Sequence, residues 1–215
     1  MNPRRRWLRI SLWVMAGLAI GAAGAYFLIP SSPEQMLEAG EADYDRGVRA
    51  LADDDNAEAA RRFDEAVLQA DKVLDDLNKK DKSGREQSDE ELRKRSRLGG
   101  RALWLKARAL RDRAFAHAAG EGKPLKLWED TTTGEKYRQV VSIPDKDVRK
   151  DAILCVVRAV GLLPDDAEVQ REALRVILTQ PPQAWDWAAI EQLCRNLVAL
   201  DPKDTRAHYL LAEFH

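Results

Sequence analysis

The longest apolar segment of the chain lies near its amino terminus. The run from Ile10 to Ile29 (ISLWVMAGLAIGAAGAYFLI) contains no charged residue. As a helix rising about 1.5 Å per residue, it would span about 30 Å, the thickness of the hydrocarbon core of a bilayer. The pattern therefore predicts a transmembrane helix over this segment.

The charges on either side of the segment predict its orientation. The preceding flank is basic and the following flank is acidic, with Arg4, Arg5, Arg6 and Arg9 before it and Glu34, Glu38, Glu41, Asp43 and Asp45 after it. Positive flanks stay on the cytoplasmic side of a membrane. We therefore expect a cytoplasmic basic stub and membrane anchor over 1–29, a linker over 30–33, and an extracytoplasmic (periplasmic) domain over 34–215.

A cleaved signal peptide is the alternative interpretation of the same segment. Ala23–Ala25 (AGA) has the small-x-small form of a cleavage site. The apolar region of a signal peptide runs for about 7–15 residues, whereas this one continues through Phe27–Ile29. We therefore favour an uncleaved anchor, and in either case the bulk of the chain is exported.

The chain after residue 33 is rich in Ala, Leu, Arg and Glu and poor in β-branched runs, which predicts helices. A polar break at 78–88 (NKKDKSGREQS) predicts a loop. Ser88 and Glu91 have the spacing of a capping box, so a long helix is expected to begin there and to end near Ala119. The acidic run 53–55 is expected to be a solvated turn.

Two β-prone runs interrupt the helical region. Leu125–Glu129 and Tyr137–Ile143 flank the polar segment Thr131–Gly134. Such runs predict a β-hairpin or an ordered loop within an insertion at 120–146. Trp128 and Tyr137 could then pair across the two strands.

Small residues at regular spacing mark a first pair of helices. Gly47 is followed by Ala59, and Ala59 begins the pattern Ala-x3-Phe63-x2-Ala66. This arrangement resembles the tetratricopeptide repeat (TPR) family, in which a small residue on one helix faces an aromatic ring and alanines on the next. The resemblance implies an all-α chain in which helix pairs stack into a solenoid with a concave binding surface.

Later segments repeat parts of the same pattern. Val160–Asp166 (VGLLPDD) recurs as Val198–Asp204 (VALDPKD), with Pro ending one helix and Asp able to cap the next. The interval between the copies is slightly longer than the family period of about 34 residues. The expected helix pairs cover about 34–77, 88–163 with the insertion, and 167–200, and another begins at 205.

The composition adds exclusions rather than an activity. The 215 residues carry a formal net charge of −1, so no global field favours nucleic acid. Cys155 and Cys194 are too few for a disulfide framework or a cysteine-built zinc site, and we expect both to be buried. No phosphate loop, nucleophile elbow or metal-ligand spacing occurs in the sequence. We therefore expect no enzyme activity, no cofactor and no metal.

One predicted helix carries a basic and aromatic stripe beside its core face. In the family that the chain resembles, the first helix of each pair lines the concave groove, so this stripe would face that groove. The groove candidates, including those on later first helices, are Arg101, Trp104, Arg108, Arg111, Arg171, Arg175 and Tyr209. Such a surface favours an acidic peptide or another anionic chain. A solvated arginine face is the alternative.

The last residues begin a further helix. From Thr205 onward, Tyr209, Leu211 and Phe214 would carry apolar surface toward a helix that the sequence does not contain. An uncovered apolar face at the end of a repeat array is unfavourable. We therefore expect the native chain to continue beyond His215.

Together these patterns predict a membrane-anchored, TPR-like interaction scaffold displayed outside the cytoplasm. Its partner would be a protein or peptide, with no role for nucleic acid. Two alternatives remain open at this point. The chain could be the amino-terminal part of a larger envelope enzyme or assembly factor, or a soluble exported binding protein released by cleavage after Ala25.

Overall fold

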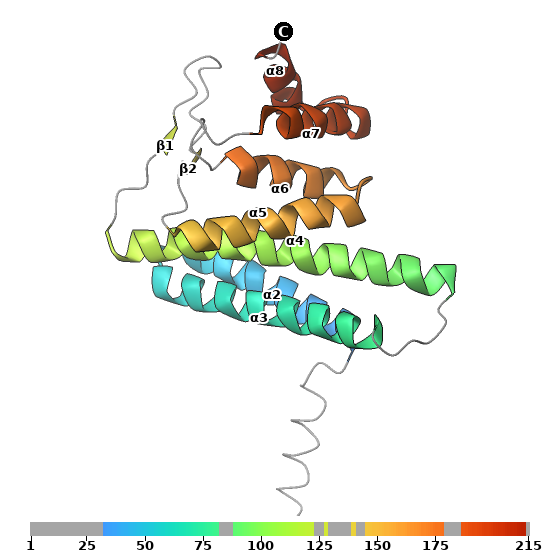
Figure 1. Cartoon of the computed structure of the whole chain (residues 1–215). Helices are drawn as coiled ribbons and strands as arrows, with labels where there is room; N and C mark the ends of the chain where they lie inside the picture. Colours follow the sequence, from blue (N-terminus) through green and yellow to red (C-terminus); the bar gives the residue numbers. More distant parts are fainter. Residues whose placement is uncertain are drawn as a thin grey trace, which may run out of the picture.

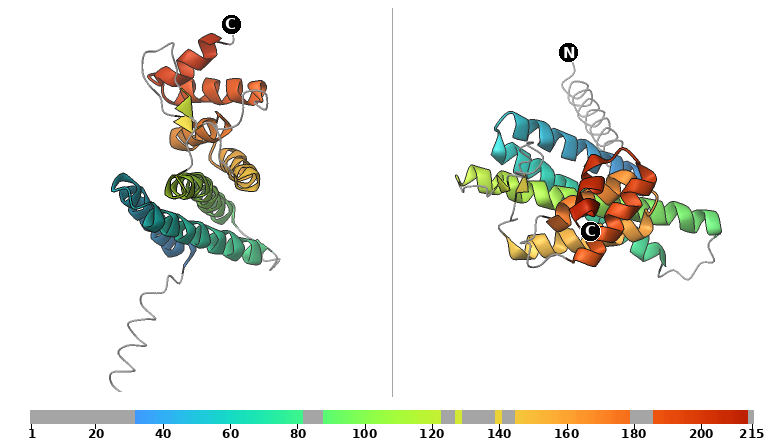
Figure 2. Two further views of the ribbon diagram at one scale, coloured as in Figure 1. Left: turned by 90° about the vertical axis from the view of Figure 1, so that its left-hand side faces the viewer. Right: turned by 90° about the horizontal axis from the view of Figure 1, so that it is seen from above.

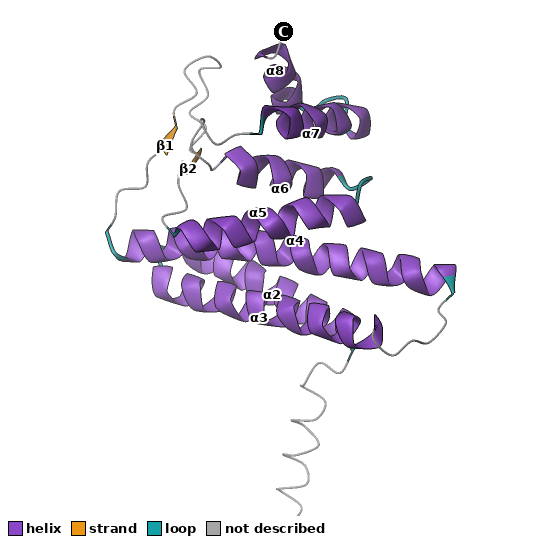
Figure 3. Cartoon of the chain, in the orientation of Figure 1, coloured by secondary structure: helices purple, strands orange, loops and turns teal. Residues whose placement is uncertain are grey.

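A computed structural model of the chain describes residues 32–81, 88–122, 127–128, 139–140, 145–178 and 186–213. Helices dominate these residues: α2 (Pro33–Ala52), α3 (Asn56–Asp81), α4 (Asp89–Gly120), α5 (Lys146–Leu162), α6 (Ala167–Leu178), α7 (Trp187–Leu200) and α8 (Thr205–Glu213). Two strands, β1 (Leu127–Trp128) and β2 (Gln139–Val140), account for the rest of the regular structure described. The expected all-α class is confirmed (Figure 3).

The helices pack in the order of the chain. Each one contacts the next, from α2 and α3 through to α7 and α8, and α4 also contacts α2 and α6. The described helices thus form an elongated stack with α2 and α3 at one end and α8 at the other (Figure 1). Two further directions of view show the same succession (Figure 2).

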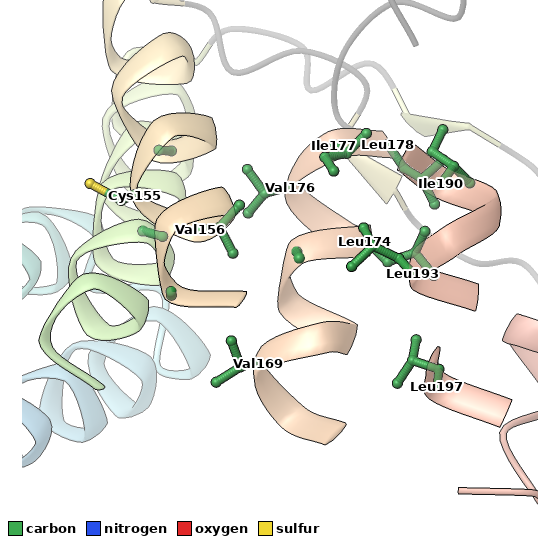
Figure 4. Close-up of a cluster of buried hydrophobic side chains, with 14 of the residues drawn as sticks. Cys155, Val156, Val169, Leu174, Val176, Ile177, Leu178, Ile190, Leu193 and Leu197 are labelled. Atoms are coloured by element: carbon green, nitrogen blue, oxygen red, sulfur yellow. The ribbon is translucent and has the colours of Figure 1, made fainter. Parts of the chain in front are cut away.

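Two clusters of buried apolar side chains lie along this stack. The first joins α2, α3 and α4 and includes Leu37, Phe63 and Leu105, each at most 1% exposed. The second runs from α4 to α8, and Figure 4 shows its central part, where Val156 of α5 and Ile190 of α7 pack on either side of α6. Helix α4 belongs to both clusters because opposite sides of it are apolar.

The helix starts follow the local capping signals. Ser88 accepts a hydrogen bond from the backbone N–H of Glu91 at 3.3 Å, and the Glu91 carboxylate accepts one from the backbone N–H of Ser88 at 2.9 Å. This capping box confirms the predicted start of α4. The run 53–55 is an exposed turn, as expected, in which Asp54 has a φ of 60°.

Helix contacts occur where glycine leaves room for a neighbour. A Cβ added to Gly47 would lie 2.7 Å from Cε1 of Phe63, so the close approach of α2 and α3 requires glycine there. This is the contact that the spacing predicts. At Gly100 an added Cβ would lie 2.6 Å from Cγ of Leu163, so glycine there leaves room for the residue that follows α5.

The loop expected at 78–88 begins later than predicted. Helix α3 continues to Asp81, which makes Asn78 and the lysines after it helical. Leu77 packs against the first cluster, and Arg95 of α4 donates a hydrogen bond to its carbonyl oxygen at 2.6 Å. These contacts explain why polar composition alone does not end the helix. Residues 82–87 lie outside the described part of the chain.

The strands fall within the two β-prone runs. They pair antiparallel, with Leu127 opposite Val140 and Trp128 opposite Gln139. The residues between the strands, including Tyr137, lie outside the described residues, so the hairpin as a whole and its Trp128–Tyr137 pair stay predictions.

The predicted anchor from Ile10 to Ile29 also lies outside the described residues. Among the helices that are described, none combines the length and apolar character needed to cross a bilayer. Helix α2 begins at Pro33, the last residue of the linker expected at 30–33, and Ser32 is its N-cap. Phe214 and His215, at the other end, are likewise not described.

Candidate functional site

The candidate side chains fall on three helices of the stack. Arg101, Trp104, Arg108 and Arg111 lie on α4, Arg171 and Arg175 lie on α6, and Tyr209 lies on α8. The contact of α4 with α6 brings the first two groups together, with an ion pair from Arg111 to Glu172 between them. Tyr209 instead donates a hydrogen bond to Glu213 of its own helix at 3.0 Å, and α8 packs against α7.

A buried network of charged groups surrounds Arg111. Its Nε donates to Oδ1 of Asp112 at 2.7 Å, and its other end pairs with Glu172. The Tyr44 hydroxyl donates to Oδ2 of Asp112 at 2.6 Å. The side chains of Arg111, Asp112 and Glu172 are 13%, 12% and 6% exposed. The network therefore links α2, α4 and α6 through contacts that solvent screens little.

Arg111 and Tyr44 both hold their protons firmly in this network. Burial disfavours the charged form of Arg111, but the Asp112 and Glu172 carboxylates raise the pKa of its guanidinium above the ordinary value. Burial, followed by the charge of Asp112, raises the pKa of the Tyr44 hydroxyl. Neither group would exchange a proton near pH 7, so the network is suited to holding helices together rather than to acid–base chemistry.

Arg108 has a different environment from Arg111. Its guanidinium carbon lies 4.0 Å from the ring centroids of both Tyr44 and Trp104, which places the cation between two aromatic faces. Within the described ranges no carboxylate pairs with it. Nε of Arg108 and Nε1 of Trp104 are buried without a hydrogen-bond acceptor. The two rings thus hold the guanidinium in place, while no carboxylate of the described helices neutralises its charge.

Two of the other candidate arginines are paired with acids. Arg101 donates to both carboxylate oxygens of Glu41 on α2, at 2.7 and 2.8 Å. Arg171 pairs with Asp204 at 2.7 Å and also with Asp201, in the turn before α8. These acids reduce the positive potential that the arginines alone would produce. Sequence reasoning missed them because they lie far from the arginines along the chain.

Arg175 is the exposed candidate on α6. Its side chain is 54% exposed, and its nearest acidic partner in the described helices is Glu172 at 3.6 Å, which already accepts from Arg111. At that distance the pair is an electrostatic contact rather than a hydrogen bond. Arg108 and Arg175 are therefore the two candidates whose guanidinium groups are least satisfied by carboxylates within the described helices.

A depression of about 340 Å³ lies where α4 ends and α5 begins, and none of the groove candidates lines it. Its lining mixes bases and acids: Arg113, Ala114, His117, Ala118, Glu121, Asp145 and Val148. Arg113 is already paired with Asp64 at 2.6 Å. In the described ranges no group of three or more His, Cys, Asp or Glu side chains could hold a metal ion. This lining therefore indicates no particular ligand.

Both cysteines are buried free thiols, as expected from their apolar neighbours. Burial raises the pKa of Cys194 to about 11 and also raises the pKa of Cys155. Figure 4 shows Cys155 on α5, pointing away from α6. Protonated, buried thiols are poor nucleophiles, so their contribution here is packing.

In comparisons with known proteins, no family model and no curated protein matches this chain. The functional argument therefore rests on the residues themselves.

Proposed function

We propose that this protein is a membrane-anchored scaffold that uses a TPR-like stack of helix pairs to bind a protein or peptide outside the cytoplasm. The observation that carries the proposal is the close contact of Gly47 with Phe63, where a Cβ would lie 2.7 Å from the ring. A small residue facing an aromatic ring across a helix pair is the feature on which the resemblance to the TPR family depends.

The order of the helix contacts supports the same interpretation. Helices α2, α4 and α6 would be the first helices of three successive pairs, and α4 contacts both of the others. In solenoids of this kind, equivalent helices of neighbouring repeats lie side by side and build one continuous binding surface. The Arg111 network ties these three helices together, which would keep such a surface rigid.

The partner we propose is an acidic peptide segment. Arg108 and Arg175 supply guanidinium groups with unused donors, and Trp104 adds an aromatic face beside Arg108. Guanidinium groups bind carboxylates through paired, charge-assisted hydrogen bonds. Stacking between two rings limits the rotamers of Arg108, so less side-chain entropy is lost when a carboxylate binds.

Binding of a glutamate-rich peptide to the full-length chain in detergent tests the partner class. Arg108→Gln should weaken binding about 10-fold, which corresponds to the loss of about one charge-assisted hydrogen bond. Lys72→Gln, at an exposed position on α3, is the matched control with the same charge change and should bind normally. Equal binding by both variants, or equal affinity for a lysine-rich peptide, would reject an acidic partner.

The proposed anchor and orientation rest on the uncharged run from Ile10 to Ile29 and on the basic flank before it. A reporter that is active only outside the cytoplasm, fused after Pro33, should be active. Mass determination of the amino terminus in the membrane fraction should find Met1 or Asn2, not a residue after Ala25. Activity of a cytoplasmic reporter at the same junction would reverse the orientation, and cleavage after Ala25 would favour the soluble exported form.

A further inference from the structure

Helix α5 exposes an apolar strip on the side opposite the core. Leu154 and Val157 are 48% and 52% exposed, whereas Val156 and Ala159 of the same helix are fully buried. Gly161 continues the strip one turn later, and a Cβ added there would meet no atom of the described residues within 4 Å. The strip is therefore open, and its glycine end would allow another helix to approach closely.

Two charges of opposite sign lie on either side of Leu154 and Val157 along the helix. Asp151 lies one turn before Leu154, Arg158 lies one turn after it, and both side chains are exposed. In the described part of the chain neither forms a hydrogen bond or an ion pair. Lys106 is near enough to Asp151 to feel its charge, but it pairs with Asp71 at 2.6 Å.

We propose that this strip binds a second copy of the same chain, with the two α5 helices antiparallel. In a two-fold contact every pair of residues occurs twice: if one residue of the first copy touches another residue of the second copy, the same two residues also touch with the copies exchanged. Antiparallel pairing would place Leu154 against Val157 of the second copy and Asp151 near Arg158 of the second copy. Both contacts then occur twice, whereas parallel pairing would place Asp151 beside Asp151.

The direction of α5 in the stack favours the antiparallel arrangement. The helix runs across the direction in which the helices succeed one another, with α2 at one end and α8 at the other (Figure 1). A two-fold axis relating antiparallel α5 helices would run along the stack and leave both α2 ends on the same side. A parallel pairing would invert one stack. If the anchor proposed above precedes α2, only the antiparallel pair places both anchors in one membrane.

Charge exchange tests the pairing in the full-length chain in detergent, with the dimer dissociation constant measured by sedimentation equilibrium. Asp151→Arg and Arg158→Asp should each weaken the dimer about 10-fold, because each places two pairs of like charges in contact. The double variant that carries both changes should restore the wild-type constant. Asp165→Arg, in an exposed turn, is the matched control and should leave the constant unchanged.

Cysteine trapping tests the geometry in membranes. The variant with both Leu154→Cys and Val157→Cys should form an oxidised dimer, while Lys72→Cys should not, and circular dichroism checks that every variant folds. A monomer at all concentrations, a dimer that the single charge changes leave intact, or a weakened dimer that the double change does not restore would each overturn the proposal. Because these readouts need neither an acidic partner nor a particular topology, they can fail independently of the proposed function.

Discussion

The two ends of the described stack are held together by different kinds of contact. At the α2–α4 end, the helices approach through small residues, with Gly47 against Phe63 and Ala59 fully buried. At the α5–α8 end, branched aliphatic side chains such as Val156 and Ile190 fill the core (Figure 4). The proposed resemblance to the TPR family rests on the first end, where small residues face a large ring. At the other end, aliphatic residues of similar size fill the contacts instead.

Charged contacts also differ between the two ends. At the α6–α8 end, Arg171 bridges the start of α6 to the turn between α7 and α8 through Asp201 and Asp204. This clamp is partly exposed, because the side chains of Arg171 and Asp201 are 25% and 37% exposed although that of Asp204 is only 10% exposed. The network of Arg111, where the two ends meet, is buried. The comparison indicates that each region is sensitive to a different change. Added side-chain volume should be most damaging at the α2–α4 end, and loss of a charge should be most damaging in the central Arg111 network. Low pH should act mainly on the α6–α8 end.

The largest expected effect is a charged side chain in the α2–α3 contact. Ala59→Arg should destabilise the protein by at least about 4 kcal/mol, because a long cation has neither room nor a partner at a fully buried position. Thermal unfolding followed by circular dichroism measures the change. Ala42→Arg, on the exposed side of α2, is the control and should alter stability by less than about 0.5 kcal/mol.

The next largest effect is expected in the buried network. Arg111→Met should cost about 3–5 kcal/mol near neutral pH, since it leaves two buried carboxylates, Asp112 and Glu172, without their cation. Urea unfolding at pH 7 tests this. Arg195→Met, which breaks an exposed pair with Glu191, should change stability little.

Two neighbouring glycines sharpen the comparison at the junction of α4 and α5. Gly100→Ala should destabilise by about 1–3 kcal/mol, because its Cβ would lie 2.6 Å from Cγ of Leu163. Gly99→Ala should stabilise by about 0.5–1 kcal/mol, because its Cβ would make an ordinary contact 3.6 Å from Leu77 and alanine favours the helix. The denaturant midpoint of unfolding measures both effects relative to the wild type. Shifts of the same sign in the two variants would contradict this account.

Local signals were sufficient to predict much of the fold. The capping box of Ser88 and Glu91 and the spacing of Gly47 and Phe63 each involve contacts that short stretches of sequence encode. Leu77 marks the limit of that approach, because its packing on another helix extends α3 beyond the point where polar composition predicts a loop.

The candidate site was less accessible to sequence reasoning. The stripe on α4 was found from its helical spacing, but its electrostatics depend on acids that lie elsewhere in the chain. Glu41 is 60 residues from Arg101, and Glu172 is 61 residues from Arg111. Nothing local distinguishes these paired arginines from Arg108, whose rings hold it without an acid. Only the tertiary structure separates the two environments.

The smallest expected effect concerns acid and the clamp at the α6–α8 end. Burial opposes ionisation of Asp204, but hydrogen bonds from the Ala207 backbone and from Arg171 lower the pKa of its carboxyl below the ordinary value. A carboxyl whose pKa is lower in the folded state binds a proton more tightly when unfolded. Its contribution to stability is therefore present above the unfolded value of about 3.9 and is lost as the pH falls through the folded value.

Arg171→Gln should raise the pKa of Asp204 toward its ordinary value and so move this loss of stability to higher pH. The variant should be less stable than the wild type by about 1 kcal/mol or less at pH 7, because the clamp is partly exposed to solvent. The two proteins should become equally stable at a pH below the folded pKa, where Asp204 is protonated in both. Carboxyl chemical shifts measured during an NMR titration report the pKa directly. An unchanged pKa of Asp204 in the variant would mean that the Ala207 hydrogen bond alone lowers it, and that Arg171 does not set the acid response of this end of the stack.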